Sequence, residues 1–113
     1  TGNIQAAVRA CEATDICVGK IAQLTLSLGG TCIITADHGN VEEMISPNNE
    51  VDTEHSTFPV PFIMIHNAFE KKALTLPKGK LADIAPTILS HMGIEVPKEM
   101  TGTNLLADID TKN

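Results

Sequence analysis

Two residues that commonly bind metal ions, Asp37 and His38, stand side by side directly after a short apolar run at residues 31–35. A carboxylate and an imidazole supply the oxygen and nitrogen ligands of manganese, zinc and magnesium-type sites. We expect both side chains to converge at the carboxyl end of a parallel strand, with Gly39 allowing the backbone to turn, because α/β proteins place ligand chemistry there. The alternative is that both residues have a structural role: aspartate can cap a turn, and histidine can be a hydrogen-bonded residue at a strand end.

A second histidine, His55, follows on an acidic stretch just before the next apolar run. Two or three oxygen and nitrogen ligands suit a divalent ion, but a two-metal centre needs more ligands than these. His66 and His91 are better explained as a strand end and a helix C-terminus. The other polar residues of the stretch are expected to form a solvated acidic face or supporting hydrogen bonds; they are Glu42, Glu43, Glu50, Asp52, Glu54, Ser56 and Thr57.

The elements that position these residues begin with a long amphipathic helix predicted over 3–28. Asn3 or Thr1 caps its start, and Gly29-Gly30 ends it. Its apolar stripe is Ile4, Ala7, Val8, Cys11, Val18, Ile21, Ala22, Thr25 and Leu28. The run at 31–35 is almost all β-branched or small and apolar, which is typical of a strand buried on both faces. A helix, a tight turn and a strand together are typical of doubly wound α/β sheets.

The second half of the chain predicts a further strand at 62–66, entered through an extended Pro-Val-Pro segment, and an edge strand near 73–76. A second helix is expected over 81–92, with Asp83 as N-cap, Pro86 in its first turn and Gly93 after its end. Its expected apolar face is Ile84, Ile88, Leu89 and Met92, while Thr87 and Ser90 pack or cap. The tail from residue 94 reads as loop that docks through Leu105 and Leu106.

The composition is that of a globular protein: 113 residues, 42% apolar and 19% charged. No apolar run approaches the roughly 20 residues of a membrane span, and no signal peptide is recognised. The three cysteines are an odd number in apolar stretches, so we expect buried free thiols in a reducing cytoplasm. The net charge of −6 is concentrated between Lys20 and Lys71, where no lysine or arginine occurs. That segment disfavours nucleic acid and anionic membranes as partners and suits a bound cation.

Four blocks of the sequence carry a resemblance to a known family. They are TADHGNVEEM at 35–44, HSTFPVP at 55–61, LADIAPTIL at 81–89 and PKEMTG at 97–102. Together they resemble the C-terminal part of cofactor-independent phosphoglycerate mutase, and the resemblance covers essentially the whole chain. The TADHG and Pro-Val-Pro elements are shared more widely in the alkaline phosphatase superfamily, including phosphopentomutase. The NVEEM continuation and the last block point to the mutase.

The resemblance implies an α/β, three-layer doubly wound alkaline-phosphatase-like domain, of which residues 1–113 form only the C-terminal part. It implies a cytoplasmic glycolytic enzyme that interconverts 3-phosphoglycerate and 2-phosphoglycerate through a phosphoserine, with two Mn²⁺ ions (Mg²⁺ in some relatives). By motif, Asp37 and His38 bind the ion nearest that serine, and His55 binds the second ion.

The same resemblance implies that the nucleophilic serine, the substrate contacts and a D-x-x-x-H metal motif lie outside this chain. We therefore expect the chain alone to be inactive and to bind metal weakly. The parent enzyme is expected to be a monomer, with a small phosphorylated substrate and no nucleic-acid or membrane partner. The isolated chain is expected to self-associate through an unpaired strand edge or an uncovered helix face.

Two other readings stay open on the sequence. One is a stand-alone metal-binding or interaction module that uses the acidic stretch, and the other is a different superfamily enzyme such as phosphopentomutase. The coding sequence upstream of Thr1 separates them, because several hundred preceding codons favour an enzyme and an immediate start codon favours the module.

Overall fold

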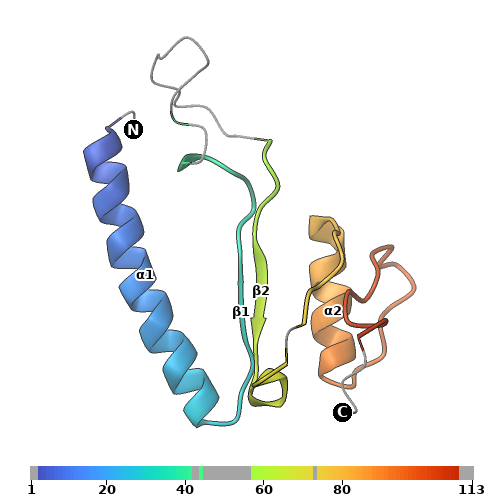
Figure 1. Ribbon diagram of the computed structural model, residues 1–113. Coiled ribbons are helices and arrows are strands. Elements are labelled where there is room, and N and C mark those ends of the chain that lie inside the picture. The colour runs from blue at the N-terminus through green and yellow to red at the C-terminus, as the bar shows by residue number, and fades with distance from the viewer. Residues whose placement is uncertain (1–2, 42–43, 45–56, 73, 110–113) are drawn as a thin grey trace. The chain divides into compact units, whose positions relative to one another are not determined.

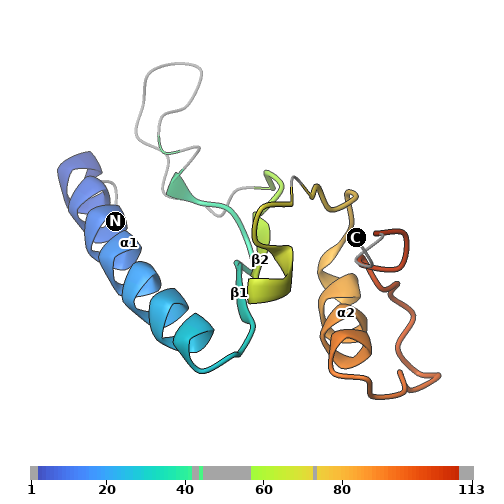
Figure 2. The ribbon, with the colours of Figure 1, turned by 60° about the horizontal axis from the view of Figure 1, so that its bottom comes forward.

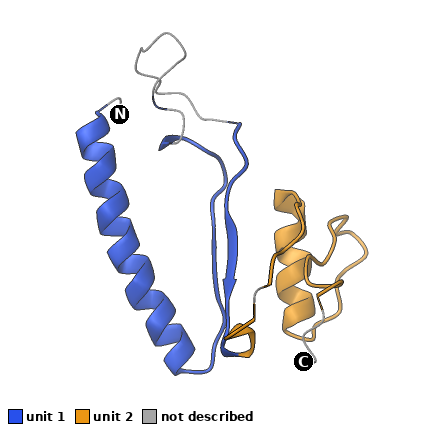
Figure 3. Cartoon of the chain, viewed as in Figure 1, with its two compact units in different colours: residues 1–67 blue, residues 68–113 orange. Residues whose placement is uncertain are grey.

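The computed structural model describes residues 3–41, 44, 57–72 and 74–109 (Figure 1). The chain divides into two compact units, Thr1–Asn67 and Ala68–Asn113 (Figure 3). The first unit contains helix α1 (Ile4–Ser27) and strands β1 (Cys32–Thr35) and β2 (Phe62–Ile65), and the second contains helix α2 (Ile84–His91). Short 3-10 helices η2 (Asn67–Phe69) and η3 (Leu81–Asp83) complete the elements. None of the helices in the described ranges is long and apolar enough to span a membrane.

Helix α1 begins and ends at the predicted positions. The Asn3 side chain accepts a hydrogen bond from the Ala6 backbone N–H at 3.0 Å, which satisfies one of the free donors of the first turn. At the other end Gly29 takes the left-handed conformation, with φ of 74°. The N–H groups of Gly29 and Gly30 then donate to the carbonyls of Leu26 and Thr25. These two bonds form a Schellman motif, which only a residue tolerant of positive φ closes without strain.

The predicted apolar stripe of α1 is wrong in part. Ala22 is the residue of this helix that is buried, whereas Ile21 is 60% exposed and Leu28 is 78% exposed. The C-terminal half of α1 carries apolar residues on more than one side of the helix, and contact with β1 does not cover all of them. Figure 2 shows the end of α1 joined to β1 by a short connection. The prediction of buried thiols also fails for Cys11 and Cys17, which are exposed on α1, while Cys32 is half-buried.

The sheet consists of β1 and β2 in antiparallel order, with Cys32 opposite Ile65 and Thr35 opposite Phe62. The expected parallel strand is therefore not observed in the described residues, and neither is burial of β1 on both faces: its first three residues are half-buried and Thr35 is exposed. A two-stranded ribbon with a helix against it leaves one face uncovered. The expected edge strand is absent over 74–76, and Ala73 lies outside the described residues. The two-stranded sheet of the described residues does not make a three-layer fold.

The second unit forms around α2. The predicted helix at 81–92 is confirmed, with a 3-10 turn as its beginning and Gly93 after it at a φ of 73°. Pro86 and Thr87 are buried on it, and the expected docking of Leu105 is confirmed at 6% exposure. Met92 was assigned to the apolar face but is 63% exposed, because it follows the last helical turn as C-cap. The Asp83 side chain does not cap α2; it accepts hydrogen bonds from Lys80 and Thr103.

Candidate metal centre

Asp37 and His38 form a bend that begins one residue after the end of β1. Strand pairing ends at Thr35, opposite Phe62, so the backbone is free to change direction there. Both residues are exposed, while the following Gly39 is buried. The glycines with positive φ in the described part are Gly29 and Gly93, so the bend at Asp37 and His38 does not depend on a left-handed Gly39.

The two side chains converge. Asp37 Oδ1 and His38 Nε2 are 3.6 Å apart, and the side chains are 87% and 39% exposed. His38 Nδ1 lies 2.9 Å from the Gly39 carbonyl oxygen. A carbonyl oxygen only accepts, so Nδ1 carries the hydrogen, and in the neutral ring the lone pair is on Nε2. This contact therefore favours the tautomer whose Nε2 lone pair lies on the side of the carboxylate.

The spacing fits two ligands of one ion. Bonds of about 2.1 Å in a tetrahedral arrangement put two ligand atoms about 3.4 Å apart, close to the 3.6 Å between Asp37 Oδ1 and His38 Nε2. Two ligands do not complete a site, and among the described residues no group of three or more His, Cys, Asp or Glu side chains is placed to hold an ion. A metal ion held by this pair would need further ligands.

The other predicted ligand, His55, lies outside the described residues, as do Glu42, Glu43, Glu50, Asp52, Glu54 and Ser56. Thr57 is described and exposed. Because Phe62 pairs with Thr35, the described chain enters β2 at the same end of the ribbon where Asp37 and His38 lie. The antiparallel register therefore leads residues 57–61 toward the candidate centre.

The structure separates His66 from the pair. Ile65 pairs with Cys32 at the start of β1, so His66 follows β2 at the opposite end of the ribbon from Asp37. His91 belongs to the second unit, where its ring lies 6.3 Å from that of Phe69 between centroids, at an interplanar angle of 38°. The interpretation of both histidines as structural is consistent with these positions.

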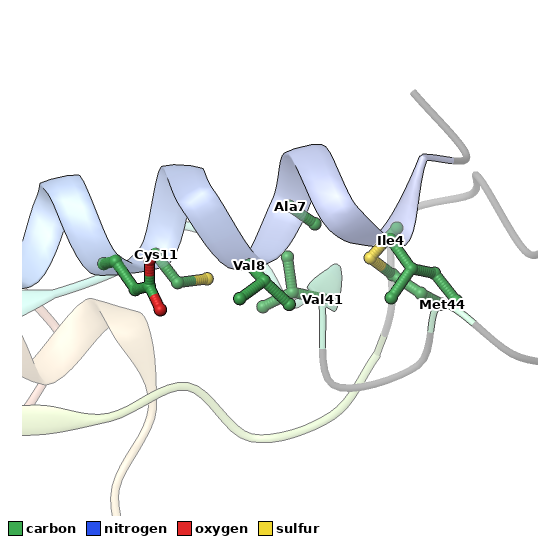
Figure 4. A pocket seen from close by; sticks show the side chains of 7 residues that line it. Ile4, Ala7, Val8, Cys11, Val41 and Met44 are labelled. Carbon is green, nitrogen blue, oxygen red and sulfur yellow. The ribbon is translucent and has the colours of Figure 1, made fainter.

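An apolar groove of about 490 Å³ lies between the first half of α1 and the chain that follows the bend (Figure 4). Val41 and Met44 approach the helix there, and Met44 is 8% exposed. The lining residues are Ile4, Ala7, Val8, Cys11, Glu12, Val41 and Met44. This contact holds the segment after His38 against α1. In the sequence, Val41 and Met44 stand on either side of two glutamates. This pair of apolar residues was the available sign of a contact with α1.

In the second unit, the carboxyl group of Asp83 has a shifted pKa. Hydrogen bonds from the backbone N–H of Thr103, and then of Lys80, lower the pKa of Asp83 below its ordinary value of 3.8. Its residue is 3% exposed. Both of these donors are backbone N–H groups, and Thr103 lies 20 residues from Asp83 in the sequence. The sequence predicts a helix cap at Asp83 and gives no sign of this arrangement.

Comparison with known proteins identifies the group to which these residues belong. A model of the metalloenzyme superfamily matches residues 1–96. The chain is similar to 2,3-bisphosphoglycerate-independent phosphoglycerate mutases: it is 50% identical to that of Clostridioides difficile over 95% of the chain. It is 53% identical to that of Clostridium beijerinckii over 96% of the chain and 54% identical to that of Clostridium perfringens over 94%. In each case the match covers 21% of the relative, so the chain spans about a fifth of the length of the curated relatives it matches.

Proposed function

The chain belongs to the metalloenzyme superfamily, and we propose that it forms the C-terminal part of the metal-binding domain of a cofactor-independent phosphoglycerate mutase. The observation that carries the proposal is an identity of 50% to 54% to such mutases across nearly the whole chain. The converging Asp37 and His38 are consistent with it, because they are metal-binding side chains at the end of a strand. The parent protein is then a cytoplasmic glycolytic isomerase.

The proposed reaction moves a phosphoryl group between the two hydroxyls of glycerate, by way of a serine that this chain does not contain. The small anionic substrate needs cationic contacts, and between Lys20 and Lys71 this chain has no lysine or arginine. The charge-neutralising side chains therefore have to come from outside this segment. The acidic balance of this segment instead suits divalent cations.

Asp37 and His38 are proposed as ligands of the ion nearest the serine, and His55 as a ligand of the second ion. When bound, Mn²⁺ would lower the pKa of the serine hydroxyl and offset the negative charge of the transferring phosphoryl group. The Asp37 carboxylate supplies one negative charge at the site. His38 supplies a neutral nitrogen whose tautomer is fixed by the Gly39 carbonyl oxygen.

The test uses the complete polypeptide that contains this sequence. We expect it to convert 3-phosphoglycerate to 2-phosphoglycerate when loaded with Mn²⁺, to lose that activity with a chelator and to recover it when Mn²⁺ is restored. The isolated 113-residue chain is expected to show no turnover under the same conditions. Interconversion of pentose 1- and 5-phosphates in place of phosphoglycerates would overturn the assignment in favour of a phosphopentomutase. Turnover by the isolated chain would refute the location of the nucleophile outside it.

A further inference from the structure

Two buried polar side chains, Asp83 and Thr87, connect α2 to a later segment of the second unit. Asp83 is 3% exposed and Thr87 is fully buried. Residues 102–105, which we call the strap, run alongside them and carry no titratable side chain. Neither residue takes part in the proposed metal centre, which belongs to the other unit. Their burial needs a separate explanation, because an uncompensated buried carboxylate is strongly destabilising.

The Asp83 carboxylate divides its oxygens between two stretches of chain. Oδ2 accepts from the Lys80 backbone N–H at 2.8 Å, which is a local bond at the start of η3. Oδ1 accepts from the Thr103 backbone N–H at 2.8 Å and from the Thr103 hydroxyl at 3.4 Å. One carboxylate therefore closes the beginning of the helix and also holds the strap.

Thr87 makes the second connection, one helical turn further on. Its hydroxyl donates to the Asp83 carbonyl oxygen at 2.7 Å and accepts from the Leu105 backbone N–H at 2.9 Å. The hydroxyl group thus connects the helix backbone to the strap. A methyl group in its place could neither donate nor accept a hydrogen bond. Thr103 and Leu105 are held by neighbouring side chains of one helix face.

Two glycines allow this close approach. A Cβ on Gly102 would overlap the Ala82 carbonyl oxygen, so the strap lies with its backbone directly on the start of the helix. A Cβ on Gly79 would meet Asp83 Oδ2 at 2.7 Å and the Leu105 side chain at 2.8 Å. The polar bonds are therefore enclosed by backbone and by the buried Leu105.

We propose that Asp83 and Thr87 form a latch which closes the strap onto α2 as one cooperative unit, and which acid opens. Opening would expose Thr87, which is fully buried and hydrogen-bonded to the strap. The strap contributes no charge, and Lys80 is the cation whose charge acts on Asp83, so the carboxylate is the group that titrates.

The sign of the pH dependence follows from the hydrogen bonds. They lower the pKa of Asp83 below 3.8, led by the bond from Thr103. A carboxyl whose folded pKa is lowered stabilises the closed state above its unfolded pKa, and this stabilisation is lost as the pH falls through the folded pKa. The latch is therefore closed throughout the neutral range and opens in acid, as the pH falls through the lowered pKa of Asp83.

Amide hydrogen exchange on the 113-residue chain tests the latch. In the original chain we expect the Thr103 and Leu105 amides to open together, with equal protection factors, because one event exposes both. Asp83→Asn is expected to speed exchange at both amides by roughly tenfold or more, since a bond to a charged acceptor is lost. Thr87→Val is expected to do the same, while Thr87→Ser keeps the hydroxyl and should stay within about threefold of the original.

Independent local bonds would behave differently. The proposal is overturned if Asp83→Asn affects the Thr103 amide alone and Thr87→Val the Leu105 amide alone. Acidification of the original chain gives a second test that needs no variant. Both amides should lose protection together as the pH falls through the lowered pKa of Asp83, after correction for intrinsic exchange and while amides of α1 keep theirs. Loss at different pH values, or only together with α1, would equally contradict the latch.

Discussion

At the scale of residues, a metal ion can use Asp37 and His38 together only if their ligand atoms converge. The bend after β1 brings them to 3.6 Å, and the Gly39 carbonyl fixes which imidazole nitrogen faces the carboxylate. Adjacent residues in a continuing extended strand would point to opposite faces. Leaving the strand at this point is therefore what turns two neighbouring side chains into a possible ligand pair.

Removing either ligand tests this reading in the complete polypeptide. Asp37→Asn and His38→Asn are each expected to lower mutase activity and Mn²⁺ affinity by about 100-fold or more, because a ligand is lost and not merely a supporting hydrogen bond. Matched controls are Asp15→Asn, on the exposed surface of α1, and His66→Asn, at the other end of the ribbon. Equal losses in ligand and control variants, measured by turnover and calorimetry, would contradict a specific role.

The strap gives a second prediction at this scale. Gly102→Ala places a Cβ against the Ala82 carbonyl, and we expect it to lower the free energy of unfolding by about 1–3 kcal/mol. Gly19→Ala is the matched control, because a Cβ there meets nothing within 4 Å and lies in α1. It should be stabilising by about 0.5–1 kcal/mol. Denaturant unfolding measures both, and a neutral Gly102→Ala would show that the strap is not closely packed.

At the level of helices and strands, signals between neighbouring residues predicted the helices. Pairing between distant strands could not be predicted from the sequence. The cap at Asn3 and the Gly29-Gly30 stop are set by neighbouring residues, so α1 could be read directly. The pairing of β1 depends on which strand lies beside it, and composition alone suggested a parallel partner where an antiparallel one is found. The candidate metal ligands and the latch differ in the same way. Asp37 and His38 are adjacent, so the sequence could predict them as a pair. Asp83 accepts a hydrogen bond from Thr103, 20 residues away, which the sequence could not predict.

The N-terminus of α1 allows a test of the predicted helix cap at Asn3. Asn3→Ala removes the bond to the Ala6 N–H and should cost about 1 kcal/mol of stability, while Asn3→Asp keeps an acceptor and should be nearly neutral. Thermal unfolding followed by circular dichroism reports both. A similar loss in the two variants would mean that the side chain does not act as a cap.

At the scale of the whole molecule, the chain leaves apolar surface uncovered. On α1, Ile21, Leu24 and Leu28 are 60%, 62% and 78% exposed, and they recur at the spacing of one helix face. Exposed apolar faces of this kind favour association. In the proposed parent, other parts of the polypeptide are available to cover this face, because the curated relatives are about five times as long as the stretch they share with this chain.

We therefore expect the isolated chain to self-associate as its concentration rises. Ile21→Glu and Leu24→Glu, each placing a charge on the exposed face, should shift the chain toward monomer in light scattering. Gln23→Glu adds the same charge to α1 outside that spacing and should leave association unchanged. A clean monomer at high concentration for the original chain would contradict the expected association.

We propose that Asp37 and His38 are ligands of a catalytic metal ion, and anomalous scattering from crystals of the complete polypeptide can locate Mn²⁺ and so test this proposal. We expect one ion at about 2.0–2.2 Å from both the Asp37 carboxylate and His38 Nε2, and a second ion bound by His55. Ions located elsewhere, or an ion on His38 Nδ1 with the Gly39 contact broken, would contradict it.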